Sequence, residues 1–256
     1  TNAPVRFAPV ALNGRLYAVS DDGYLYCLDA ANGKLLWKVN GGPSDREIIG
    51  NGRLVSSWTA RGGPVVADGV VYFTAGIWPS MGIFIHAVDA QNGRILWTNS
   101  ETGSEFIVHP HRASSFGSVV PQGYLAVSEN SLIVPGGRSL PAVLDRKTGK
   151  VVHFQFGGKS SGGFAVTAAD QFFVVGRDIF RLDNGDELAS ADIKVISNEL
   201  VIGNLSQTIV VHPLSNSIRE TIITDKRGRR EKKLAYRPQQ VKSISFDDTA
   251  PTHVRL

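Results

Sequence analysis

The stretch PVALNGRLYAVSDDGYLYCLDAANGKLLW, residues 9–37, decides the fold, because it recurs as PVVADGVVYFTAGIWPSMGIFIHAVDAQNGRILW at residues 64–97. Both copies run through short segments rich in Val, Leu, Ile, Tyr and Phe, separated by turn residues in the same order. The recurring positions are Asp29 and Asp89, Gly33 and Gly93, and Trp37 and Trp97. A repeat of this kind predicts one supersecondary unit used several times.

The turn residues within each copy predict how many strands it forms. Asn13-Gly14 and Asp68-Gly69 separate β-rich runs, and such pairs supply the positive φ angles that tight hairpin turns require. Three turns per unit give about four antiparallel strands. A four-stranded sheet cannot bury both faces alone, so the units are expected to stack around an axis as the blades of a β-propeller. The terminal tryptophan is large enough to fill space between blades, and its indole N–H then needs a partner.

Three weaker copies follow, so the sequence predicts an all-β propeller of four-stranded antiparallel blades with at least five recognisable. We interpret residues 1–256 as one propeller domain. Its clear repeats occupy residues 9–97, its degenerate repeats residues 124–218, and a basic linker with a final strand region residues 224–256. The weaker copies are centred at residues 124–154, 164–188 and 196–218, and the alternating run 241–246 completes one blade or begins another.

Composition sets further limits on the function. The longest apolar runs are too short to span a bilayer as a helix, and the first residues carry no signal-like core, so we expect a mature or excised piece. The single cysteine, Cys27, lies in an alternating run and is expected to be packed. Residues 226–233 carry a net charge of +5, so the basicity is local. This run is expected to be an exposed loop or linker, with contact to an acidic polymer or a lipid headgroup as the alternative. Because it has no interleaved aromatic residues, no nucleic acid partner is expected.

The repeat unit, with DDGYLYCLD followed by NGKLLW, resembles that of the pyrroloquinoline-quinone (PQQ) repeat family. The resemblance is specific in the first two copies and weak from about residue 160 onward. It implies a large propeller, usually extracytoplasmic, of the kind found in quinoprotein alcohol dehydrogenases, in an outer-membrane assembly lipoprotein and in large multidomain bacterial proteins. In the dehydrogenases, the family pattern includes a vicinal disulfide, a calcium site and a catalytic Asp. One cysteine cannot form that disulfide. We match no residue of this chain to the calcium site or to the catalytic Asp of the dehydrogenases.

Three local motifs suggest chemistry but have simpler interpretations. The run Gly158–Gly162 matches a serine nucleophile elbow, yet a β-type segment follows where the elbow needs a helix. His109 and His111 lack further ligands at metal-site spacing. The repeated aspartates Asp21, Asp22, Asp29, Asp89 and Asp145 are interpreted as turn residues, because Asp accepts hydrogen bonds from backbone N–H groups two residues on. No catalytic residue and no metal site is therefore predicted.

Long insertions follow the first two tryptophans, at residues 41–61 and 99–118, and loops of this kind often carry function. Trp58, Trp78 and Arg138 lie in or beside turn-rich inserts and are the candidate binding residues. The sequence favours a non-catalytic module that binds a protein, peptide or saccharide partner within a larger bacterial protein. The alternative is the propeller, or a fragment, of a PQQ-dependent quinoprotein dehydrogenase with PQQ and Ca²⁺.

Overall fold

The chain folds into two compact units, residues 1–166 and residues 167–256, as the computed structural model shows. The structure describes residues 1–50, 52–103, 105–108, 112–117, 119–137, 139–154, 162–169, 171–190, 193–197, 200–205, 208–213, 218–224, 228–236 and 242–245. In this part of the chain, no helix is long and apolar enough to cross a bilayer.

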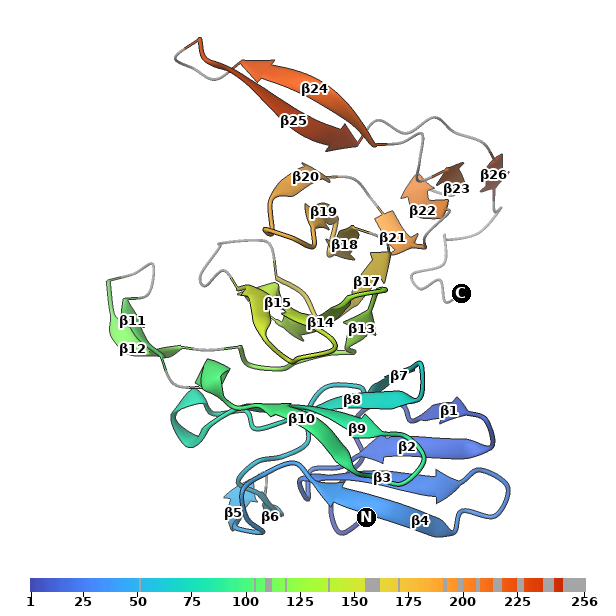
Figure 1. Ribbon diagram of the computed structural model, residues 1–256, viewed down its shortest axis with the longest axis vertical. Helices are drawn as coiled ribbons and strands as arrows, with labels where there is room; N and C mark the ends of the chain where they lie inside the picture. Colours follow the sequence, from blue (N-terminus) through green and yellow to red (C-terminus); the bar gives the residue numbers. More distant parts are fainter. Residues whose placement is uncertain are drawn as a thin grey trace. The chain divides into compact units, whose positions relative to one another are not determined.

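The first unit contains three four-stranded antiparallel sheets, each formed by strands in chain order (Figure 1). They match the predicted blades. Blade 1 consists of β1 (Val10–Leu12), β2 (Arg15–Val19), β3 (Tyr24–Asp29) and β4 (Leu35–Asn40). Blade 2 consists of β7 (Val65–Ala67), β8 (Val70–Ala75), β9 (Phe84–Asp89) and β10 (Ile95–Asn99). Blade 3 consists of β13 (Ala126–Val127), β14 (Ser131–Gly136), β15 (Ser139–Asp145) and β16 (Val151–His153).

The turns form as their residues predict. Asn13 and Gly14 have φ angles of 50° and 73°, and Asp68 and Gly69 have 50° and 75°, which matches a tight hairpin turn with two left-handed residues. After the third strand, the Asp29 carboxylate accepts hydrogen bonds from the Ala31 and Asn32 N–H groups. The same bonds recur at Asp89 and Asp145, which confirms the turn role of these three aspartates.

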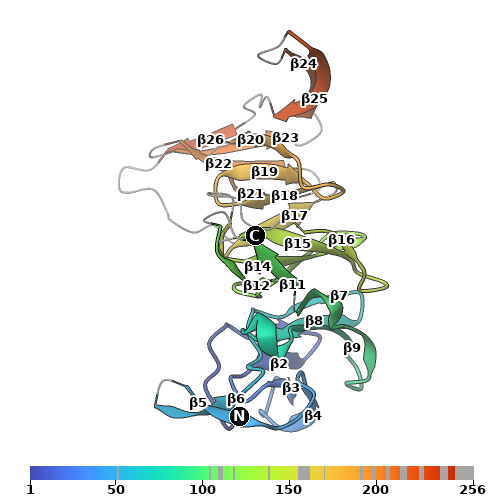
Figure 2. The same cartoon turned by 90° about the vertical axis from the view of Figure 1, so that its left-hand side faces the viewer.

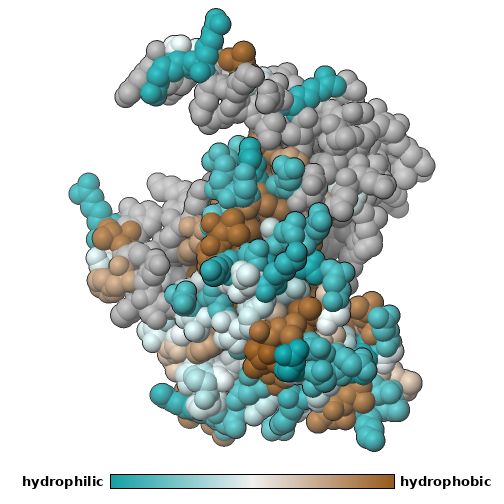
Figure 3. Space-filling view, in the orientation of Figure 1, coloured by the Kyte–Doolittle hydropathy of each residue, from teal (hydrophilic) through white to brown (hydrophobic). Residues whose placement is uncertain are grey.

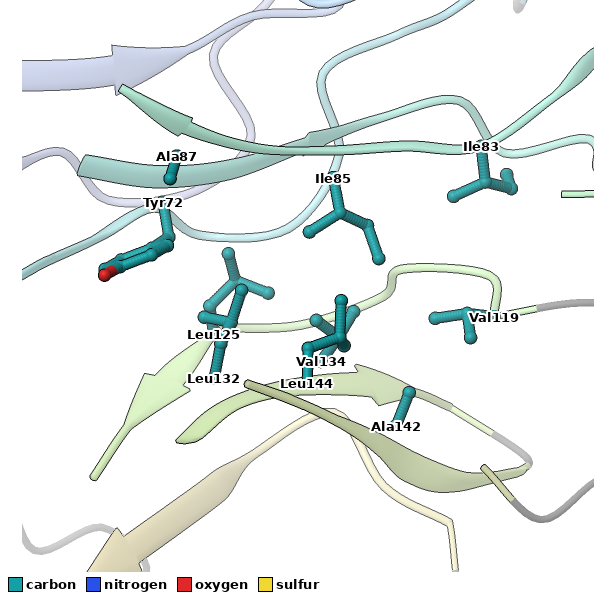
Figure 4. Close-up of a cluster of buried hydrophobic side chains, with 10 residues drawn as sticks. All are labelled: Tyr72, Ile83, Ile85, Ala87, Val119, Leu125, Leu132, Val134, Ala142 and Leu144. Atoms are coloured by element: carbon teal, nitrogen blue, oxygen red, sulfur yellow. The ribbon is translucent and has the colours of Figure 1, made fainter. Parts of the chain in front are cut away.

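Neighbouring blades of this unit share two apolar cores. Strand β8 turns Val71 and Phe73 toward blade 1 and Tyr72 toward blade 3, so period-2 alternation buries both of its faces. The core between blades 2 and 3 is drawn in Figure 4, where Ile83 and Ile85 face Leu132, Val134 and Leu144. The core between blades 1 and 2 includes Cys27, which is fully buried. The packing role expected for this cysteine is confirmed.

The tryptophans that end the first two repeats each pack on the turn glycine of the next blade. A Cβ atom placed on Gly93 would lie 2.9 Å from the Trp37 ring, and one on Gly149 would lie 2.5 Å from the Trp97 ring. The Trp97 Nε1–H donates to the Arg146 carbonyl oxygen at 3.1 Å, as the sequence led us to expect. Trp37 differs, because its buried Nε1 has no hydrogen-bond partner among the described residues.

Both insertions of the first unit form hairpins outside the blades (Figure 2). The first contains β5 (Glu47–Gly50) and β6 (Arg53–Ser56), and the second contains β11 (Glu105–Val108) and β12 (Ser114–Gly117). Short 3-10 turns, η1 (Pro79–Met81) and η2 (Glu101–Gly103), lie within blade 2 and after it. Figure 3 shows apolar surface at the β11–β12 hairpin on the left edge, where Phe106 and Val108 are exposed.

The second unit contains two further four-stranded sheets. Blade 4 consists of β17 (Val166–Ala169), β18 (Phe172–Val175), β19 (Asp178–Arg181) and β20 (Glu187–Ser190). Blade 5 consists of β21 (Ile193–Ile196), β22 (Leu200–Leu205), β23 (Thr208–Pro213) and β26 (Lys242–Ser245). Strand β26 pairs with β23, so the alternating run near the end of the chain completes blade 5. The predicted turn at residues 214–217 lies outside the described residues.

The expectation of a basic linker from residue 224 needs correction. Strands β24 (Ile218–Thr224) and β25 (Arg230–Tyr236) pair as a long hairpin, which the sequence inserts between the third and fourth strands of blade 5. Alternation in this segment is masked by its many charged side chains, which explains why the sequence did not indicate strands. The single-domain assignment of residues 1–256 remains a prediction.

Candidate functional site

The first unit contains an open cleft of about 460 Å³. Its walls come mainly from the segments that lead into the first strands of successive blades. In a repeat fold, equivalent positions of successive units lie side by side, so these segments meet in one place. The lining residues are Phe7, Arg61, Ile77, Trp78, Pro121, Gln122, Gly123 and Phe164.

Two arginines at equivalent repeat positions meet beside this cleft, and one of them, Arg61, lines it. Arg6 precedes β1 in the stretch RFAPV, and Arg61 precedes β7 in the stretch RGGPV. In each stretch a proline directly precedes the strand, and each arginine stands four residues before its strand begins. The repeat therefore delivers two guanidinium groups to one region of the first unit.

Both guanidinium groups bind the carboxylate of Asp21. The Arg6 Nε lies 2.5 Å from one carboxylate oxygen, and the Arg61 Nε lies 3.1 Å from the other. The Asp21 side chain is only 2% exposed, whereas about a third of each arginine side chain reaches solvent. A buried carboxylate is stabilised by such paired charges. Because two cations face one anion, the cluster keeps a net charge of +1 beside the cleft.

Aromatic side chains supply most of the remaining wall. Trp78 is 53% exposed and Phe164 is 62% exposed, which is unusual for such large apolar residues. Phe7 packs edge-on against Tyr124, with ring centroids 5.4 Å apart, and the Tyr124 hydroxyl accepts the Ala8 N–H. The cleft therefore combines accessible aromatic surface with a cationic edge.

Trp58 supports the cleft from inside the fold. Its side chain is buried, and its Nε1–H donates to the Met81 carbonyl oxygen at 2.7 Å. Met81 ends the 3-10 turn η1, which directly follows Trp78. Trp58 also packs edge-on against Phe84. Trp58 thus holds in place the turn next to Trp78 without reaching the cleft itself.

The floor of the cleft needs glycine at one position. Gly123 has a φ angle of 122°, and a Cβ atom there would lie 1.9 Å from the Phe164 carbonyl oxygen. The Gly123 carbonyl oxygen accepts the Gly63 N–H at 2.8 Å, and the Tyr124 N–H donates to the Phe164 carbonyl oxygen. Close backbone packing, which any side chain would prevent, joins the segments that carry the lining residues.

The three residues singled out from the sequence have different positions. Trp78 lines the cleft, Trp58 is buried beneath the adjacent turn, and Arg138 lies outside the described residues. Sequence reasoning missed Arg6 and Arg61, although the repeated pattern R-x-x-P-V was a usable signal for both.

The turn role expected for Asp21 is wrong, because its carboxylate binds the two arginines. Asp22 does act in its turn, since its carboxylate accepts the Tyr24 N–H at 3.2 Å. It also accepts the Tyr26 hydroxyl at 2.7 Å. Burial, together with this bond, raises the pKa of Tyr26.

His86 belongs to the core. It is buried, its ring stacks on Phe73 at 4.7 Å, and its Nε2–H donates to the Gly41 carbonyl oxygen. The Thr98 hydroxyl then donates to Nδ1, because a neutral ring has one donor and one acceptor nitrogen. Burial lowers the pKa of His86 to about 4. His109, His111 and residues 158–161 of the Gly158–Gly162 motif lie outside the described residues.

A second opening of about 400 Å³ lies between blades 2 and 3, beside Arg146. The guanidinium binds Asp68 at 2.7 Å and the Tyr72 hydroxyl at 3.2 Å. It also donates to the carbonyl oxygens of Ser128 and Glu129. These bonds satisfy the charge, so Arg146 joins two blades and offers little to a ligand.

The cleft residues do not fit a quinone and calcium site. Calcium takes six to eight oxygen ligands, mostly carboxylates and carbonyls. Asp21, the carboxylate in contact with the cleft residue Arg61, is already bound by two arginines. Within the described ranges, no three His, Cys, Asp or Glu side chains gather as metal ligands. No chemical step is therefore assigned to such a group.

Comparison with known proteins places these repeats in a family. A family model for PQQ-type repeats, described as outer membrane protein assembly factor BamB, matches residues 2–155. Quinone alcohol dehydrogenase subunits of Gluconacetobacter polyoxogenes and Komagataeibacter europaeus are 38% identical to this chain over 86 residues. That stretch is 33% of this chain and 11% of theirs.

The crystal structure of BamB from Moraxella catarrhalis has a TM-score of 0.51 and 12% sequence identity to this chain. The alignment covers 94% of this chain and 64% of BamB, so the chain spans less than two thirds of the length of these relatives. At this level of identity the likeness concerns the fold, and it confirms the predicted β-propeller.

The family match covers more than half of the chain and falls within the first unit, where the repeats are clearest and the cleft lies. The turn aspartates and the repeat tryptophans of that unit belong to the motif by which the sequence resembles PQQ repeats. The chain belongs to the PQQ-repeat family of β-propellers described by the outer membrane protein assembly factor BamB.

Proposed function

We propose that this chain is a non-catalytic binding module that holds an extended peptide segment of a protein partner in the cleft beside Asp21. The observation that carries the proposal is the combination of exposed aromatic surface at Trp78 and Phe164 with the cationic edge formed by Arg61. Aromatic and arginine side chains dominate the energy of many protein interfaces.

The chemistry of the cleft favours a peptide with apolar and acidic side chains. Apolar side chains would cover Trp78 and Phe164, whose exposure to water is costly in the free protein. A carboxylate would approach the Arg6 and Arg61 guanidinium groups, which keep a net positive charge after pairing with Asp21. Arginine binds carboxylates with two parallel hydrogen bonds, which adds orientation to attraction.

A saccharide fits the cleft less well. Sugar rings stack on aromatic faces, but their many hydroxyl groups need a matching set of polar side chains. Among the lining residues, Arg61 and Gln122 have polar side chains, and the rest are apolar, aromatic or glycine. A saccharide partner is therefore the weaker form of this proposal.

Family membership supports a protein partner. The family is described as an outer membrane protein assembly factor, and a factor of that kind acts on other proteins. We extend this to an extracytoplasmic location and to further domains or blades beyond the present sequence, since the chain covers 64% of the BamB chain that it matches.

A second candidate function rests on the match to quinone alcohol dehydrogenases at 38% identity. In that case, the chain is a portion of a quinoprotein dehydrogenase, and its cleft is one side of a cofactor site. The lack of fit to calcium around Asp21 makes this the weaker candidate.

Peptide titration tests the proposal. The probe is a synthetic decapeptide that alternates Phe with Glu, and the reference peptide replaces each Glu by Lys. We expect saturable binding of the acidic peptide, monitored by isothermal titration, and weaker binding of the basic one. Equal affinity for both peptides would show that the arginines do not attract acidic side chains of the peptide.

Variants connect the binding to this cleft. Trp78→Ala and Arg61→Met should each lower the affinity by roughly ten-fold, about 1.4 kcal/mol. Ile49→Ala is the matched control, because Ile49 is 82% exposed on the β5–β6 hairpin and does not line the cleft. If the control weakens binding as much as Trp78→Ala, the peptide binds elsewhere.

A further inference from the structure

The hairpin of β24 and β25 is an addition that its blade does not need. Blade 5 has its four strands in β21, β22, β23 and β26, and the hairpin lies between the last two in the sequence. Its strands pair with each other from Ile218 opposite Tyr236 to Thr224 opposite Arg230. The four strands of blade 5 pair without the hairpin, and its strand β25 lies against β20 of blade 4.

This hairpin carries the whole net charge of the protein. Residues 218–236 contain seven of the 27 Lys and Arg residues and three of the 23 Asp and Glu residues. Their net charge is +4, which equals the net charge of the full chain, so the remaining sequence is balanced. Concentrated charge of one sign creates a local field that attracts surfaces of the opposite sign.

Most of the described side chains of the hairpin are exposed to solvent, and Thr221 is half-buried. Arg219, Arg229 and Arg230 are exposed, and Arg219 and Arg230 form no ion pair within the ranges that the structure describes. Ile222 is 60% exposed and lies opposite Lys232 in the pairing register. At the top of Figure 3, the described part of the hairpin is mainly hydrophilic with a small apolar area.

We propose that the β24–β25 hairpin docks the protein onto an anionic phospholipid surface. Lys and Arg residues near such a surface are attracted by its negative potential, and each contributes about a five-fold gain in affinity. An exposed isoleucine among cations suits the boundary between headgroups and acyl chains, where apolar groups enter and charged groups remain outside. This function is additional to peptide binding, because the hairpin and the cleft belong to different units.

Nucleic acid and acidic peptides are less suitable occupants. The hairpin sequence has one aromatic residue, Tyr236, whereas single-stranded nucleic acid is bound by several aromatic residues that stack on bases. An acidic peptide would need a groove to define its path, and neither of the two openings described above includes a hairpin residue. A broad anionic surface needs only the exposed cations and the apolar contact.

Vesicle co-sedimentation of the full chain tests the proposal. The probes are vesicles of phosphatidylcholine alone and vesicles with three parts phosphatidylcholine to one part phosphatidylglycerol, at 50 mM and 300 mM salt. We expect binding to the anionic vesicles, weakened at the higher salt, and none to the neutral ones. Binding of equal strength to both vesicle types would overturn the proposal.

Two double variants locate the contact. Arg219→Gln with Arg230→Gln should lower the vesicle partition coefficient by roughly 25-fold, five-fold for each charge. The control variant, Arg53→Gln with Arg94→Gln, removes two exposed charges from the first unit. It should change the vesicle partition coefficient less than two-fold. Ile222→Ser should weaken binding at both salt concentrations. The proposal fails if both double variants behave alike, or if an oligonucleotide or polyglutamate binds while anionic vesicles do not.

Discussion

Replacing Trp97 and Trp37 by Phe measures what the repeat tryptophan contributes to blade packing. Both rings pack on a turn glycine of the next blade, and both lie near a tyrosine, with ring centroids 6.0 Å apart for Trp97 and 5.9 Å for Trp37. The two sites differ in one respect. The Trp97 Nε1–H donates to Arg146, whereas the buried Trp37 Nε1 finds no acceptor in the described part of the chain.

The expected magnitudes follow from that difference. Trp97→Phe loses a hydrogen bond worth about 1 kcal/mol and part of the ring contact, for a total of about 1 to 2 kcal/mol. Trp37→Phe loses similar contact but also removes a buried unsatisfied donor, whose burial costs about 1 to 3 kcal/mol. The second variant should therefore be close to neutral or slightly stabilised.

Thermal unfolding followed by far-ultraviolet circular dichroism is the suitable assay, because it does not depend on tryptophan emission. For a unit of 166 residues, 1 to 2 kcal/mol corresponds to a decrease in Tm of roughly 3 to 6 °C. Trp97→Phe should show this decrease, and Trp37→Phe should stay within about 2 °C of the wild type. Equal losses for both variants would refute the role assigned to the Trp97 hydrogen bond.

Three further predictions concern the first unit. Asp21→Asn leaves Arg6 and Arg61 without their anion and should lower the free energy of unfolding in urea by about 2 kcal/mol. This loss is smaller than that for breaking a fully buried ion pair, because the arginines are partly exposed. An unchanged unfolding midpoint would contradict the prediction. Gly123→Ala should destabilise the unit and weaken peptide binding, since its Cβ would meet the Phe164 carbonyl oxygen; titration at a temperature where the variant stays folded checks this. Burial lowers the pKa of His86 from 6.5 to about 4. Between these two pH values the unfolded state binds more protons than the folded state. The free energy of unfolding should therefore fall by up to about 3 kcal/mol as the pH drops from 6.5 toward 4. In urea unfolding at pH 7.5, 5.5 and 4.5, His86→Gln should make the stability less dependent on pH. If the variant loses as much stability at low pH as the wild type, His86 is not the source of the pH dependence.

Much of the fold could be predicted from the sequence because the repeats place the same turn chemistry at regular intervals. Asn13-Gly14 and Asp68-Gly69 require hairpins, and the later Asp and Gly residues define the next turn. Strand β26 was also indicated, because it keeps a period-2 alternation. The β24–β25 hairpin was not, since charged residues on both strands hide the alternation that normally distinguishes a strand from a loop.

The candidate site was harder to predict because it depends on residues far apart in the chain. Trp78 was identified as an aromatic residue in an insert, and the structure places it in the cleft. Trp58 has similar sequence surroundings but is buried, and nothing in its local pattern separates the two. Asp21 shows the same limit, since its position in a turn suggested a local role and its actual partners come from the segments before β1 and β7.

Isothermal titration of one protein sample with two ligands tests the central claim most directly. The first titration uses PQQ with Ca²⁺, followed by a dye-linked assay with several primary alcohols, and the second uses the acidic decapeptide. A non-catalytic binding module predicts saturable peptide binding that Trp78→Ala weakens, with neither tight PQQ binding nor alcohol oxidation. A stoichiometric submicromolar complex with PQQ, together with turnover, would contradict this account and identify the chain as part of a quinoprotein dehydrogenase.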